Sequence, residues 1–176
     1  MTRSVSMLFL TLLISCPVAG QSSNPTSQTR DEQAIKRVVA QTDEYWNNHE
    51  FSKNAELRTD DAEDVNVVGQ RQTRSEIPST PPWFQKAFGA STIHSTVIWI
   101  KFIKPDVAAV DVSWEMTGGR CPDGSDDARP QTYRKGLESL VMTKQRGRWL
   151  VAVFHNMDLP VTPAGSTRPD IPCQFR

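Results

Sequence analysis

The sequence lacks an excess of either charge. Its 20 Lys and Arg residues balance its 20 Asp and Glu residues. No basic cluster alternates with aromatic residues, which is the usual electrostatic signature of a protein that binds nucleic acid. We therefore expect no nucleic acid among its partners. With 176 residues and 38% hydrophobic content, the chain suits a single globular domain.

Long apolar runs are also scarce. The run Met7–Ile14 is too short to span a bilayer, follows the basic Arg3, and is followed by the small residues 18–20. This pattern indicates an export signal over residues 1–20, cleaved before Gln21. Alternatively, residues 13–16 resemble a lipobox, which would leave a lipidated Cys16 as a membrane anchor. We expect an exported protein, periplasmic or secreted, with no membrane contact unless Cys16 is lipidated.

Cysteine is rare, with three residues in the chain. Removal of the signal would leave Cys121 and Cys173, an even pair in an oxidising compartment where a disulfide can persist. The alternative is two free thiols that never meet. Neither cysteine lies in a CxxC motif or beside a histidine, so nothing supports a metal site or a nucleophile there. We expect no metal and no cofactor.

The polar segment 21–28 has the composition of a disordered linker, and the folded domain is expected over residues 29–158, followed by a Pro-rich tail over 159–176. A capping box at Thr29–Glu32 and helical spacing up to His49 predict a long amphipathic helix. Two shorter helices are predicted, one over 51–57 and one within 75–89 that follows the proline pair at 81 and 82, where proline suits a first helical turn. Between them, the acidic residues 60–64 are interpreted as a solvated turn that leads into a short strand over 65–68.

The pattern changes from helix to sheet after Ala90. Four strands are predicted, and the connections around Pro105 and Gly147 have hairpin chemistry, so these strands should pair antiparallel. Helices followed by strands are typical of an α+β domain. Two of the strands are apolar on both faces, so a symmetric partner subunit is expected to cover the outer face, giving a homodimer. The predicted strands are 96–103, 107–116, 133–144 and 149–156.

Three segments carry a resemblance to a known family. The helix end YWNNH (45–49), the segment DDAEDVNVVG (60–69) and the closing GRWLVAVFHN (147–156) resemble the SnoaL-like branch of the nuclear transport factor 2-like superfamily, which includes ketosteroid isomerase. The resemblance implies three N-terminal helices packed on a curved, mainly antiparallel sheet, a cystatin-like cone with a pocket, usually in a dimer. Members include isomerases, dehydratases, polyketide cyclases and non-catalytic domains, so the fold does not select a function.

The isomerase residues can be compared with this sequence position by position. The resemblance places Thr42 where the isomerases have a tyrosine, Asn66 where they have the aspartate base, and Ser139 where they have an aspartic acid donor. An amide cannot accept the proton that the base must carry. We therefore expect no ketosteroid isomerisation.

The closing strand ends in two polar residues, His155 and Asn156. Strict alternation places Leu150, Ala152, Phe154 and Asn156 on one face, and Trp149, Val151, Val153 and His155 on the other. The resemblance favours the Asn156 face as the pocket wall, with His155 at the outer face or the end of the sheet.

Two hypotheses follow for the function. The first is a secreted module that binds a small apolar or aromatic molecule in the pocket. The second is an enzyme of the polyketide cyclase, isomerase or dehydratase type that uses His155 for acid–base chemistry. The candidate ligand-binding residues are Thr42, Trp46, Asn66, Trp114, Ser139 and Asn156.

Overall fold

A computed structural model describes residues 25–67, 69–77, 82–120 and 130–161 of the chain. The predicted export signal, the three cysteines on which the predicted disulfide and the alternative lipid anchor depend, and most of the C-terminal tail lie outside the described residues. The predicted linker is shorter than expected, because helix α1 (Pro25–Asn47) already includes residues 25–28. Proline is well accommodated in the first turn of a helix, where its missing N–H is not needed.

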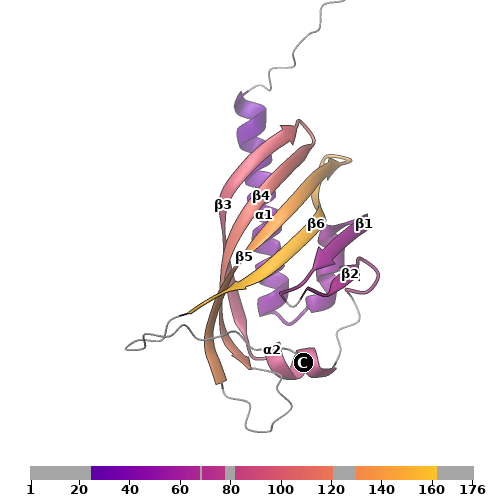
Figure 1. Cartoon of the computed structure of the whole chain (residues 1–176). Helices are drawn as coiled ribbons and strands as arrows, with labels where there is room; N and C mark the ends of the chain where they lie inside the picture. Colours follow the sequence, from indigo (N-terminus) through magenta and orange to yellow (C-terminus); the bar gives the residue numbers. More distant parts are fainter. Residues whose placement is uncertain (1–24, 68, 78–81, 121–129, 162–176) are drawn as a thin grey trace, which may run out of the picture.

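The described elements form one six-stranded sheet with helices on one side (Figure 1). The strand order is β2-β1-β6-β5-β4-β3, and every neighbouring pair is antiparallel except β1 and β6, which are parallel. The α+β class is confirmed, with a mixed sheet. After α1, the elements are η1 (Phe51–Leu57), β1 (Arg58–Val65), β2 (Arg71–Thr73), α2 (Pro82–Phe88), β3 (Thr92–Lys104), β4 (Val107–Arg120), β5 (Pro130–Gln145) and β6 (Arg148–Leu159).

The prediction of three N-terminal helices is confirmed only in part. Only α1 is a long α-helix among the described residues. By contrast, η1 is a 3₁₀ helix of seven residues and α2 is an α-helix of seven residues. The predicted third helix is α2, which begins at Pro82, where proline suits the first helical turn. Within the described part of the chain, no helix is both long and apolar enough to cross a membrane.

The acidic segment 60–64 is a strand and not a solvated turn. It belongs to β1, in which Ala62 and Asp64 are buried while Asp60 and Asp61 are exposed. The carboxylate of Asp64 is buried because the guanidinium of Arg58 binds it. This pairing allows an acidic sequence to lie against the core.

The main core lies between α1 and the inner face of the sheet. Ile35 and Val39 of α1 pack against Val110 and Val112 of β4 and their neighbours on β5 and β6. A second cluster joins α2 to Trp114 and Met116 of β4. Gly136 permits this cluster, because a Cβ at that position would overlap the indole ring of Trp114.

A β-bulge breaks the strict alternation expected for β6. Val151 pairs with Met142 and Val153 pairs with Val141, so Ala152 is an extra residue on its strand. Trp149 and Val151 therefore share the inner face with Phe154 and Asn156, which corrects the expected assignment of faces. The outer face bears exposed Trp99 and Met157, and its coverage by a second subunit stays a prediction.

Candidate ligand-binding cavity

A small cavity lies between α1 and the inner face of the sheet. It encloses about 280 Å³, including its open mouth. The cavity volume proper is about 10 Å³, room for about one water molecule and far below the roughly 300–1,000 Å³ of common ligand pockets. A ligand larger than a water-sized group must therefore occupy the mouth or move side chains. The walls are mainly aliphatic and contain four polar side chains. The lining residues are Val38, Val39, Thr42, Arg58, Ser95, Glu138, Leu140, Val151 and Phe154.

Glu138 is the most unusual of these residues. It lies on the inner face of β5 and is only 7% exposed. Burial raises the pKa of its carboxyl group to about 8; the nearby Arg58 opposes this shift, and the carboxylates of Asp43 and Asp64 add to it. No hydrogen bond to its carboxyl group is found among the described residues, and its oxygens are not completely shielded from solvent. At neutral pH, Glu138 is therefore a protonated acid at the wall of a cavity.

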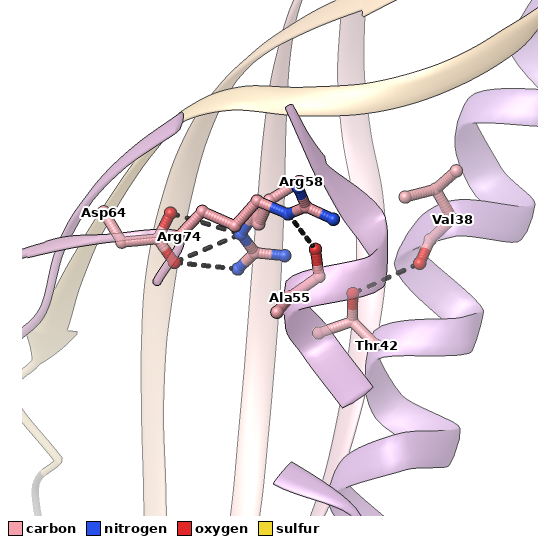
Figure 2. Close-up of polar contacts among 6 residues, drawn as sticks. All are labelled: Val38, Thr42, Ala55, Arg58, Asp64 and Arg74. Atoms are coloured by element: carbon pink, nitrogen blue, oxygen red, sulfur yellow. Dashed lines mark hydrogen bonds and ion pairs between the residues drawn. The ribbon is translucent and has the colours of Figure 1, made fainter. Parts of the chain in front are cut away.

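Arg58 enters the same cavity with its charge already paired. Its Nε lies 3.1 Å from both carboxylate oxygens of Asp64, and its Nη2 lies 3.0 Å from Oδ2 (Figure 2). The guanidinium also stacks over the ring of Phe154, 5.1 Å from its centroid. Both members of the ion pair are largely buried. The pair is neutral as a whole, so Arg58 adds little net positive charge to the cavity.

The two hydroxyl groups of the cavity, those of Thr42 and Ser95, use their protons elsewhere. Thr42 Oγ1 donates to the carbonyl oxygen of Val38 at 3.2 Å (Figure 2). Ser95 Oγ donates to Asp43 Oδ1 at 2.6 Å, and the backbone N–H of Ser95 donates to Asp43 Oδ2. Burial raises the pKa of Asp43, although these hydrogen bonds from Ser95 oppose the shift. The oxygens of Thr42 and Ser95 can still accept hydrogen bonds.

Of the predicted ligand-binding residues, only Thr42 lines this cavity. Asn156 lies on the inner face directly opposite Glu138, and its Oδ1 accepts a 2.7 Å hydrogen bond from Trp114 Nε1. Trp114 is in the core, and Trp46 donates to Ser91 Oγ within the second cluster. Both tryptophans therefore support the fold beside the cavity and do not form its walls.

Three other predicted residues lie away from the cavity. Asn66 closes the turn after β1, where its Oδ1 accepts from the backbone N–H of Gln70. Ser139 is on the outer face of β5 and donates to Asp111 Oδ1 at 2.9 Å. His155 pairs with Ser139 across the strands and is exposed on the same outer face. Asn66 and Ser139 therefore do not line this cavity, and His155 lies on the outer face as the resemblance favours; roles for these residues in binding or catalysis stay predictions.

The sequence analysis missed Arg58, Ser95 and Glu138. Glu138 could have been found, because it interrupts a series of inward-facing positions on β5 that continues with Leu140 and Met142. An acidic residue in an apolar alternating series is a local conflict that often marks a functional site. Ser95 and Arg58 give no such signal in the sequence. Among the described residues, no three His, Cys, Asp or Glu side chains are grouped so that they could hold a metal ion.

Replacing Asn156 by leucine is expected to lower the free energy of unfolding. The indole N–H of Trp114 would remain buried without an acceptor, which costs about 1–3 kcal/mol. Chemical denaturation measures this loss. The double variant Asn156→Leu/Trp114→Phe removes both partners and should lose less than the sum of the two single variants. Strictly additive losses would show that the hydrogen bond contributes nothing.

Comparisons with known proteins identify the fold. No family model matches the sequence, and no curated protein matches it. Among solved structures, a candidate scytalone dehydratase from Novosphingobium aromaticivorans is similar with a TM-score of 0.65 and 18% identity, covering 76% of this chain and 87% of that chain. A nuclear transport factor 2-like protein of unknown function from Shewanella oneidensis has a TM-score of 0.57 and 16% identity, covering 73% and 99% of the two chains.

A third similar structure is a hexachlorocyclohexane dehydrochlorinase from Novosphingobium barchaimii, with a TM-score of 0.64 and 11% identity, covering 87% of this chain and 99% of that chain. Another neighbour, from Nostoc punctiforme, is described as having a cystatin-like fold. The chain thus has the nuclear transport factor 2-like, cystatin-like fold that the sequence resemblance implies. At these identities the likeness defines the fold alone.

Proposed function

We propose that this protein binds a small, mainly apolar or aromatic molecule in the cavity between α1 and the sheet. The observation that carries the proposal is Glu138, a buried and protonated carboxyl group that faces the cavity without a hydrogen-bond partner among the described residues. A ligand that pairs with this carboxyl group would gain a hydrogen bond inside the cavity, which contributes about 0.5–1.5 kcal/mol. The aliphatic side chains around it provide the apolar contact area.

An NMR titration with two uncharged probes, cyclohexanol and phenol, tests this proposal. The amide signals of Thr42, Glu138 and Leu140 should shift with a common saturation curve, because all three residues line the cavity. The signals of Asp111 and Ser139, on the outer face, serve as the internal control. Shifts confined to the outer face, or no saturable shifts with either probe, would contradict a binding cavity at this place.

Proton transfer is a second candidate function, and the raised pKa of Glu138 favours it. An acid–base group is most effective when its pKa lies near the working pH, and burial brings the pKa of this carboxyl to about 8. A candidate dehydratase and a dehydrochlorinase are among the structural neighbours, and both types of reaction remove a proton together with a leaving group. In this chain Glu138 would carry the proton. Any activity found should be lost in Glu138→Gln and retained in His155→Ala.

A further inference from the structure

The cavity offers mostly hydrogen-bond acceptors. Thr42 Oγ1 and Ser95 Oγ donate hydrogen bonds to the carbonyl oxygen of Val38 and to Asp43 Oδ1, so they retain only acceptor capacity. The carboxyl group of Glu138 becomes a pure acceptor when it is ionised. The three residues that carry these oxygens, on α1, β3 and β5, therefore line one small space. A primary ammonium group has three N–H donors, one for each of these three acceptor groups.

The charges around the cavity also favour a cation. Glu138 is surrounded by Asp43 from α1 and by Arg58 and Asp64 from β1, while β6 places the neutral Asn156 opposite it. These are three carboxyl groups and one guanidinium, and that guanidinium is held by Asp64 in a bidentate contact. One more positive charge would be balanced once Glu138 releases its proton, whereas an anion would meet an acidic environment.

We propose that the ligand of this cavity is a small primary amine with an apolar body, whose ammonium group binds Glu138, Thr42 and Ser95 and displaces the proton of Glu138. The inference rests on the proposed function, because it assigns a chemical class to the ligand of the same cavity. The ammonium nitrogen forms an ion pair with the carboxylate, and the released proton goes to solvent. The aliphatic walls formed by Leu140, Val151 and their neighbours contact the hydrocarbon part.

Proton displacement gives the binding a characteristic dependence on pH. Below the pKa of Glu138, about 8, each bound amine must release one proton, so affinity rises with pH. With one proton released, the affinity should increase about 50-fold between pH 6 and pH 8 and then level off while the amine stays protonated, up to roughly pH 10. A neutral ligand that accepts the proton of Glu138 would show the opposite trend.

Three six-carbon probes that differ mainly in charge test the inference: cyclohexylamine, cyclohexanol and cyclohexanecarboxylate. Their dissociation constants are measured by NMR titration of the full chain at pH 6, 7, 8 and 9. At pH 8 and above, we expect cyclohexylamine to bind more tightly than the other two probes, with the pH dependence described above, and the carboxylate to bind most weakly. If cyclohexanol binds and the amine binds no better, the amine inference fails while the proposed function stands. If none of the three binds, both fail.

Variants separate the ion pair from general packing. Glu138→Gln should weaken cyclohexylamine binding at pH 8 by tenfold or more and should remove its pH dependence, while cyclohexanol binding changes little. Thr42→Val keeps the shape of the wall and removes one acceptor, so it should weaken amine binding severalfold. Ser139→Ala, on the outer face of the same strand as Glu138, is the matched control and should leave binding unchanged. Amine binding that is insensitive to Glu138→Gln would overturn the inference.

Discussion

Replacing Arg58 by methionine should lower the free energy of unfolding by about 3–5 kcal/mol at neutral pH. The substitution leaves the carboxylate of Asp64 buried without its partner, beside the carboxyl groups of Asp43 and Glu138. Removing one member of a buried ion pair is costly because the remaining charge is neither hydrated nor neutralised. Chemical denaturation of both proteins under identical conditions measures the difference.

Two further variants test whether the loss of stability comes from the buried ion pair. Arg58→Met/Asp64→Leu removes both charges and should recover most of the lost stability, because a buried ion pair and an apolar replacement are often nearly equivalent. Arg71→Met breaks an ion pair with Glu63 on the same sheet edge, but the Arg71 side chain is 69% exposed. Its loss should change stability by less than about 1 kcal/mol. Equal losses for Arg58→Met and Arg71→Met would contradict the buried pair.

The second large effect concerns the dependence of stability on pH. The carboxyl group of Glu138 has a pKa of about 8 in the folded chain against 4.5 ordinarily. Between these two values, unfolding releases a proton, so this group lowers stability as the pH rises through that window. Relative to Glu138→Gln, which cannot titrate, the wild-type protein should lose about 4 kcal/mol between pH 5 and pH 9.

Denaturation midpoints at pH 5, 6, 7, 8 and 9 for the two proteins test this directly. The difference in the free energy of unfolding should grow steadily up to about pH 8 and then become constant. Glu44→Gln, an exposed position on α1, is the control and should follow the wild-type curve. A constant difference between wild type and Glu138→Gln at every pH would show that the carboxyl group does not titrate in this range.

Much of the fold could be predicted from local patterns. Hydrophobic periodicity and turn residues predict α1 and the hairpins formed by β3 to β6, because these elements depend on contacts close in sequence. The acidic strand β1 could not be predicted in the same way. Its burial depends on the pairing of Asp64 with Arg58 and on parallel pairing with β6, about 90 residues further along the chain.

The candidate site was harder to predict because bulges change which face a residue occupies. On β6, the extra Ala152 brings Val151 and Phe154 to the same face, although their spacing predicts opposite faces. On β5, the resemblance to ketosteroid isomerases placed their aspartic acid donor at Ser139. The residue that faces the inside of the fold is its neighbour Glu138. A shift of one residue exchanges the two faces of a strand. Thr42 was placed at the cavity because the continuous helix α1 has no such irregularity.

The central claim is that Glu138 is a protonated acid in the wall of a binding cavity. Its side-chain carboxyl ¹³C resonance, assigned by comparison with Glu138→Gln and followed from pH 3 to pH 10, measures this protonation directly. We predict a titration midpoint near pH 8 for the free protein, which moves to lower pH when the chain is saturated with cyclohexylamine. A midpoint near 4.5, unchanged by the amine, would contradict the account.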